Sequence, residues 1–147
     1  MNWASLLFAC LAGALITIQA GSNSQLKKSL GEPMPAVMIN YVIGFCVVVA
    51  YSVVRHAPMA SLDKAGQVPW WAWSGGMWGS VYGVAAVLLA SKLGAAPLTA
   101  LVVTGQLICS VLLDHFGWVG FEVHPAGWGR IVGCALMVAG LTLIAKF

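Results

Sequence analysis

The segment GQLICSVLLDHFG, residues 105–117, combines a membrane-type apolar run with three side chains that could do chemistry. Gln106 places an amide near its start, and Asp114 and His115 place a carboxyl group and an imidazole at its end. Polar groups inside a bilayer are costly unless they are hydrogen-bonded, so they either bind a ligand or hold helices together. Which role each side chain has depends on its depth in the bilayer. That depth follows from its position along a membrane-spanning helix.

Composition places the chain in a membrane. Hydrophobic residues make up 61% of the 147 residues and charged residues only 7%, whereas soluble domains carry about 25% charged residues. The Lys and Arg residues form no basic tract, so we expect no nucleic-acid partner. The N-terminal segment lacks the basic stretch of a signal peptide, which indicates a retained first helix. We therefore expect an all-α integral membrane protein whose surroundings are the lipid bilayer.

Five apolar segments are long enough to span a bilayer, which takes about 20 helical residues. We expect one five-helix transmembrane domain over residues 1–147, with helices near 3–26, 35–54, 70–91, 97–115 and 128–146. Prolines stand at or just before the later helix starts, where their missing N–H has no helical partner: Pro35, Pro69, Pro97 and Pro125. Five spans put the two termini on opposite sides, here named side A for the N-terminus and side B for the C-terminus.

Glycines recur at intervals of four in two of the expected helices. Gly75, Gly79 and Gly83 lie in the third helix, and Gly129 and Gly133 lie in the fifth. Small residues at this spacing share one face and let neighbouring helices approach closely in lipid. These faces either pack within one subunit or form the seam of a dimer.

Basic residues are almost evenly divided between the two sides. Three are expected on side A and four on side B: Arg55, Lys64 and Arg130 against Lys27, Lys28, Lys92 and Lys146. Orientation normally follows an excess of Lys and Arg on the cytoplasmic side. Because the excess is so small, we expect the chain to insert both ways and two copies to pair antiparallel.

Many secondary transporters consist of two repeats with opposite orientations in the membrane. A five-helix unit that pairs with an inverted copy of itself would correspond to one of these repeats. The chain also resembles the YdcZ family, a branch of the drug/metabolite transporter superfamily, over essentially its whole length. The resemblance is carried by GQLICSVLLDHFGWVG, by QAGSNSQLKKSLG, and by a G-R-x-x-G-x6-G pattern through Arg130, Gly133 and Gly140. It implies a multi-pass transporter of the bacterial inner (plasma) membrane, from a family whose members occur as single five-helix proteins, as pairs and as fused ten-helix chains. It implies no particular substrate.

Amides and phenols within the spans are the candidate substrate-lining groups: Gln106, Gln19, Asn40, Asn23, Tyr41 and Tyr82. Gln106 falls near the midpoint of the fourth helix, where it either lines the substrate site or bonds to another helix. Gln19 and Asn40 lie at similar depth on adjacent helices, and we expect a vestibule there that opens toward side B. Asn23 either belongs to it or is the solvated end of the first helix.

Asp114 lies in the last turn of the fourth helix, where a negative charge opposes the helix dipole. Arg130 opens the fifth helix on the same side, so we expect the two to form an ion pair. That pair either holds the structure or acts in gating. His115 could titrate near neutral pH, or it could be an inert interfacial side chain.

No Asp, Glu, Lys or Arg is expected at mid-membrane, so nothing matches the central glutamate of the related small multidrug resistance family. Amides, hydroxyls and aromatic faces fit a neutral or weakly polar substrate better. The cysteines form no CxxC pair, and the three histidines all map to side A. We expect no metal site, no cofactor and no catalytic residue.

These patterns together predict a transporter of small polar or amphiphilic metabolites. We expect it to work by alternating access as a homodimer whose second copy is inverted. Two alternatives stay open: a non-transporting membrane anchor or assembly subunit, and one half of a heterodimeric transporter.

Overall fold

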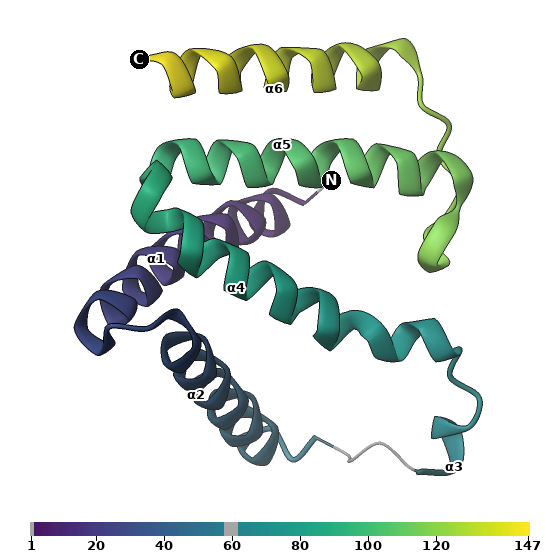
Figure 1. Cartoon of the computed structure of the whole chain (residues 1–147). Helices are drawn as coiled ribbons and strands as arrows, with labels where there is room; N and C mark the ends of the chain where they lie inside the picture. The colour runs from purple at the N-terminus through teal and green to yellow at the C-terminus, as the bar shows by residue number, and fades with distance from the viewer. Residues whose placement is uncertain (1, 58–61) are drawn as a thin grey trace. The chain divides into compact units, whose positions relative to one another are not determined.

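The computed structural model describes residues 2–57 and 62–147, with side chains except at residues 62 and 63. These ranges contain no strand, and their helices follow one another along the chain (Figure 1). The elements are α1 (Trp3–Leu30), α2 (Pro33–Val54), α3 (Leu62–Ala65), η1 (Trp70–Ser74), α4 (Gly75–Leu93), α5 (Ala95–Phe116), η2 (Trp118–Gly120) and α6 (Trp128–Lys146). Five of the helical stretches are long and apolar enough to cross a membrane, which confirms the predicted all-α membrane class.

The main difference from the predicted boundaries lies at the end of α1. This helix ends at Leu30 rather than near residue 26, and its last turn carries Lys27 and Lys28. Positive charges are favourable there because of the helix dipole. Gly31 stops the helix with φ = 79°, and its N–H donates to the carbonyl of Lys27. Glycine adopts this left-handed conformation without steric cost.

The third span also begins differently from the prediction. Residues 70–74 form a 3-10 turn, and the regular α-helix starts at Gly75. α4 then runs to Leu93, two residues beyond the predicted end. The other spans agree with the predicted boundaries to within two residues. Proline and glycine residues mark most of their ends, because these residues favour the start or the end of a helix.

Contacts divide the chain into two compact units, Met1–Ser91 and Lys92–Phe147. The first contains α1, α2 and nearly all of α4, and the second contains α5 and α6. A single domain over residues 1–147 stays a prediction.

In the first unit, α1 and α2 pack together as a hairpin, and α4 joins them. A small apolar cluster marks the junction, with Ala36, Val37 and Val87 buried and Leu26 and Val84 packed against them. All three helices contribute to this cluster. It therefore fixes α1, α2 and α4 relative to one another at one end of the unit.

In the second unit, α5 and α6 pack as a second hairpin, joined by residues 117–127. Gly117 ends α5 with φ = 65°, and a Cβ added there would lie 2.7 Å from Cγ2 of Val123. Glycine is therefore needed both for the left-handed backbone and for this close approach. Val119 also has a positive φ, 56°, which is unfavourable for a β-branched residue.

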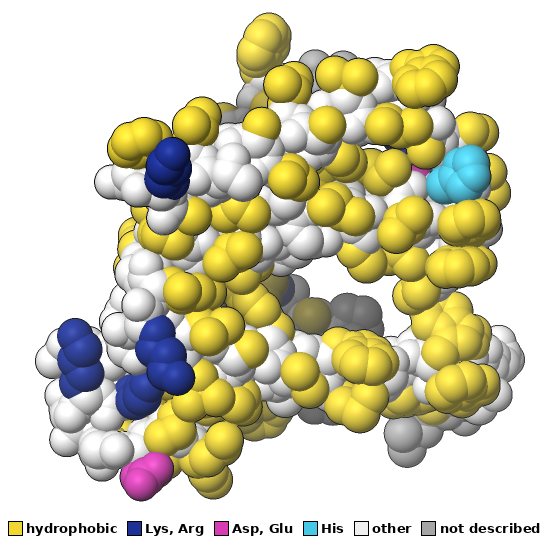
Figure 2. Space-filling model, turned by 45° about the horizontal axis from the view of Figure 1, so that its top comes forward, with side chains coloured by type: hydrophobic (Ala, Val, Ile, Leu, Met, Phe, Trp, Pro, Cys, Tyr) yellow, Lys and Arg dark blue, Asp and Glu magenta, His cyan; other side chains and the backbone are white. Residues whose placement is uncertain are grey.

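Hydrophobic side chains cover most of the helix surfaces in the face drawn in Figure 2. Large apolar side chains such as Phe8, Val48 and Leu136 are more than 60% exposed. An exposed apolar surface of this extent belongs in lipid rather than in water.

Candidate functional site

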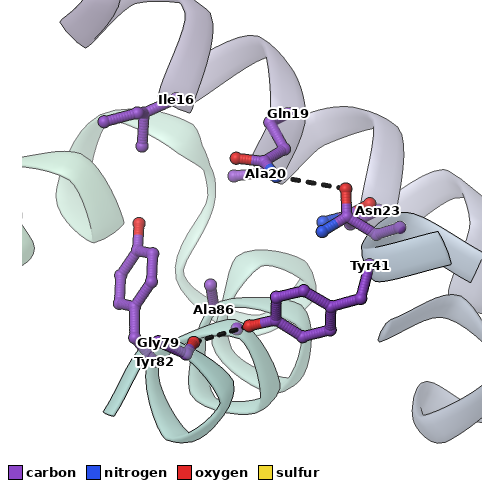
Figure 3. A pocket seen from close by; sticks show the side chains of 10 residues that line it. Ile16, Gln19, Ala20, Asn23, Tyr41, Gly79, Tyr82 and Ala86 are labelled. Atoms are coloured by element: carbon purple, nitrogen blue, oxygen red, sulfur yellow. Dashed lines mark hydrogen bonds between the residues drawn. The ribbon is translucent and has the colours of Figure 1, made fainter. Parts of the chain in front are cut away.

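A cavity of about 240 Å³ lies among α1, α2 and α4 in the first unit (Figure 3). It collects five of the six residues predicted to line a substrate site: Gln19, Asn23, Asn40, Tyr41 and Tyr82. The rest of its wall is small or apolar, including Ile16, Gly79 and Ala86. The three helices thus bring together polar side chains that are up to 63 positions apart in the sequence (82 − 19).

Hydrogen bonds between helices hold three of the lining side chains in place (Figure 3). Gln19 Nε2 donates to Asn40 Oδ1 at 3.1 Å, which joins α1 to α2. The Tyr41 hydroxyl donates to the backbone carbonyl of Gly79 at 2.6 Å, which joins α2 to α4. Both bonds satisfy polar groups that would otherwise be costly within a membrane.

Gly83 is the position in α4 at which Tyr41 approaches closely. A Cβ added to Gly83 would lie 2.5 Å from the Tyr41 hydroxyl oxygen. The absence of a side chain there leaves room for the phenol to reach the Gly79 carbonyl. The other glycines predicted to pack helices have no atom within 4 Å of an added Cβ: Gly75, Gly79, Gly129 and Gly133. A role for these four in contacts with a second copy stays a prediction.

The cavity wall combines apolar surface with polar side chains that carry no charge. Its lining includes no Asp, Glu, Lys, Arg or His. The Gln19 carbonyl oxygen and the Asn40 amide nitrogen are not used in the bond between these residues, and Asn23 and Tyr82 add a further amide and phenol. The wall therefore offers both donors and acceptors next to two aromatic rings.

A vestibule that opens toward side B stays a prediction. The apolar cluster lies next to the cavity: Leu26 follows Asn23 on α1, Val37 precedes Asn40 on α2, and Val84 and Val87 stand on either side of the lining residue Ala86 on α4. Sequence spacing gave the depth of the polar groups but not the packing of the apolar residues next to them.

Gln106 lies near the middle of α5, in the second unit, and its side chain is exposed. It makes no hydrogen bond to any residue that the structure describes. An amide at this depth is costly in lipid unless it is bonded or faces water. Gln106 thus remains a candidate for contact with substrate or with a second copy.

The ion pair predicted on side A is present in the second unit. Arg130 Nη1 lies 3.0 Å from Asp114 Oδ2, and the two side chains are 40% and 30% exposed. Arg130 also donates to the carbonyl of His124, whose own N–H donates to the carbonyl of Asp114. These bonds hold the connection 117–127 against the ends of α5 and α6. A gating role for the pair stays a prediction.

His115 takes part in the same connection. Its Nδ1 accepts a hydrogen bond of 3.0 Å from the backbone N–H of Ala126. Its ring also meets the ring of Phe116 edge to face, with 4.7 Å between the centroids. His115 therefore helps to hold the connection between α5 and α6 in this conformation.

Sequence reasoning missed one polar contact beside the cavity. Lys27 Nζ donates to the hydroxyl of Ser91 at 3.0 Å, which joins α1 to α4 across 64 positions of sequence. The sequence predicts Lys27 only as one of the basic residues of side B. The sequence contained one indication of this contact. Lys27 stands four residues after Asn23, and residues four apart lie on the same face of a helix.

Five helices long and apolar enough to cross a membrane define a multi-pass membrane protein, and no charged side chain lines the cavity among three of them. Residues 4–143 match the family described as "Putative inner membrane exporter, YdcZ". The chain therefore belongs to the YdcZ family, which confirms the resemblance, and it is a multi-pass protein of the bacterial inner membrane.

A curated relative agrees with this membership. The chain is 26% identical over 142 residues to the inner membrane protein YdcZ of Escherichia coli (strain K12), covering 97% of this chain and 95% of the relative. No solved structure matches the chain.

Proposed function

We propose that this protein exports small, uncharged polar or amphiphilic metabolites and binds them in the cavity among α1, α2 and α4. The observation that carries the proposal is the lining of that cavity, which combines amides and phenols with no charged side chain. Its volume of about 240 Å³ lies just below the range of about 300–1,000 Å³ that is usual for drug-sized ligands. A small metabolite fits these dimensions. The direction of transport follows the description of the family as an exporter.

The working unit that we propose is a homodimer of oppositely inserted copies. In many secondary transporters the substrate path lies between two inverted repeats, and one copy of this chain supplies five spans. The exposed amide of Gln106 supports the proposal, because a second copy or a substrate would satisfy it within the membrane.

Thermal stability of the purified protein tests the binding site. We would compare neutral sugars, nucleosides and aromatic alcohols with close analogues that carry a full carboxylate or ammonium charge. We expect some neutral compounds, and none of the charged ones, to raise the melting temperature, because a ligand that binds only the folded state stabilises it. Stabilisation by the charged analogues alone would contradict the proposal.

Two variants connect any such ligand to the cavity. Asn40→Leu removes the amide from the wall at similar volume and should abolish the ligand-dependent rise. Ser52→Ala changes a side chain that bonds only within α2, to the carbonyl of Val48, and should leave the rise unchanged. An unaltered response in Asn40→Leu would place the binding site elsewhere.

Transport of the same ligand in proteoliposomes tests the role of Gln106. We expect Gln106→Ala to lose transport while the protein still purifies as a dimer. If Gln106 only joins helices, dimer content and transport should instead fall in proportion, which would argue against a place in the substrate path.

A further inference from the structure

We propose that Lys27 and Ser91 form a binding site for the phosphate group of an anionic membrane lipid. The two residues lie near the ends of α1 and α4, where the ammonium of Lys27 donates a hydrogen bond of 3.0 Å to the hydroxyl of Ser91. Both residues belong to the first unit, and neither lines the cavity. The inference therefore does not depend on the proposed function.

The bond between the two side chains leaves hydrogen-bond donors free on both. A lysine ammonium has three N–H donors, of which Ser91 takes one, and a serine hydroxyl that accepts a bond keeps its own hydrogen to donate. Ser22, Ser52 and Ser80 donate that hydrogen to the carbonyl four residues before them. Ser91 makes no such bond with any residue that the structure describes. Two neighbouring groups are thus free to donate to the oxygens of one phosphate.

The positive charge of Lys27 is not neutralised within the described part of the chain. The ion pair found there joins Arg130 to Asp114, and no carboxylate of the described side chains pairs with Lys27. Lys28 adds a second positive charge in the same turn of α1. Lysine binds phosphate as a point charge, and basic residues between helices at a membrane surface bind the headgroups of anionic lipids.

The position of Lys27 along α1 corresponds to the depth of lipid headgroups. The helix begins at Trp3, which is 84% exposed, as is typical of a tryptophan at a membrane interface. Lys27 stands 24 residues further along the helix (27 − 3), which is a rise of about 36 Å. Because the hydrocarbon core is about 30 Å thick, the ammonium reaches the headgroups of the opposite leaflet.

Apolar surface for the acyl chains of a lipid continues from the site along α4. Leu88 stands three residues before Ser91, is 39% exposed, and lies on the same face of the helix. A lipid whose phosphate binds Lys27 and Ser91 can therefore place its chains on this face. A free phosphate ion would gain nothing from the apolar surface, which favours a lipid as the occupant.

Binding of phosphatidylglycerol to the purified protein in a neutral detergent tests the site. Native mass spectrometry would count the bound lipids, with phosphatidylcholine as the reference, because its choline group already balances the charge of its phosphate. We expect phosphatidylglycerol to bind more tightly than phosphatidylcholine. Equal binding of the two lipids would overturn the proposal.

Two variants assign the binding to the Lys27–Ser91 pair. Ser91→Ala keeps every charge and should weaken the binding of phosphatidylglycerol about fivefold, the factor that corresponds to one ordinary hydrogen bond. Lys27→Ala should weaken it about tenfold or more, because hydrogen bonds between charged groups are stronger. Unchanged binding in Ser91→Ala would contradict the site.

Matched controls separate a site from a diffuse attraction between charges. Ser80→Ala removes a hydroxyl that bonds within α4, and Lys64→Ala removes an exposed lysine of α3. Both should leave the binding of phosphatidylglycerol unchanged. If Lys64→Ala weakens binding as much as Lys27→Ala does, the lipid responds to overall charge and the proposal is wrong.

Thermal unfolding distinguishes a bound lipid from a free anion. Phosphatidylglycerol mixed into the detergent should raise the melting temperature of the parent chain more than that of Lys27→Ala, because a lipid that binds only the folded state stabilises it. Inorganic phosphate at the same concentration should raise neither. An equal rise with inorganic phosphate would indicate a site for free anions and would exclude the lipid.

Discussion

At the residue scale, polar contacts between helices hold the side chains that line the cavity. Tyr41 is the clearest case, because its hydroxyl bonds to a backbone carbonyl of α4 while its ring forms part of the cavity wall. Gly83 makes room for that hydroxyl. The contribution of this contact to stability can be measured by adding a methyl group to α4 at position 83.

We expect Gly83→Ala to destabilise the protein although alanine favours helix formation. The new Cβ would lie 2.5 Å from the Tyr41 hydroxyl, so the phenol must move and lose its bond, at a cost of about 1 kcal/mol. Gly76→Ala is the matched control, because an added Cβ there meets no atom within 4 Å. Thermal unfolding in detergent should give a lower melting temperature for Gly83→Ala than for Gly76→Ala. The reverse order would mean that Tyr41 does not need this space.

The Asp114–Arg130 pair should contribute little to stability by itself. Because both side chains are partly exposed, a double-mutant cycle with Asp114→Ala and Arg130→Ala should give a coupling energy below about 1 kcal/mol. Lys146→Ala, at the other end of α6, should show no coupling to Asp114→Ala. A coupling of several kcal/mol would mean that the pair is buried in the assembled protein.

At the scale of elements, the connection between α5 and α6 carries local backbone strain. Val119 has φ = 56° and its side chain is 58% exposed, so its conformation is unfavourable and little burial offsets it. Val119→Gly should therefore raise stability by about 1 kcal/mol, the balance between relieved strain and the greater freedom of glycine in the unfolded chain.

Gly117→Ala in the same connection should act in the opposite direction. The position has φ = 65°, and an added Cβ would lie 2.7 Å from a methyl group of Val123. Both variants can be compared by thermal unfolding in one detergent. A loss of stability in Val119→Gly would show that the valine side chain makes contacts in the membrane that outweigh the strain.

At the scale of the whole molecule, the balance of charges between the two sides leads to a test of inverted pairing. Ser29→Lys with Glu32→Lys adds positive charge to side B, and Gln67→Lys with Glu122→Lys adds it to side A. Each pair of substitutions should fix one orientation, because Lys-rich ends stay in the cytoplasm.

Copies that carry two different affinity tags would report the pairing. If the dimer is antiparallel, two side-B variants should fail to co-purify, whereas a side-A variant and a side-B variant should co-purify. Cysteine labelling of each terminus would verify the orientations. Efficient co-purification of two copies fixed in the same orientation would contradict the antiparallel dimer.

The sequence by itself determined the class of fold and most helix ends. A membrane span must be apolar for about 20 residues and must satisfy its backbone within itself, so composition and the positions of proline were sufficient to find all five spans. The same reasoning identified the polar residues at unusual depth, and five of them line one cavity. The end of α1 was misplaced because its final turns are polar and so resemble a connection.

Only the tertiary structure decided which side chains meet. The bonds of Gln19 with Asn40, of Tyr41 with Gly79 and of Lys27 with Ser91 join different helices, and helical periodicity within one segment contains no information about its neighbour. The apolar cluster was hidden for the same reason, because Ala36, Val37 and Val87 look in the sequence like any lipid-facing residues. Their burial depends on how three helices converge, which is a property of packing rather than of any single segment.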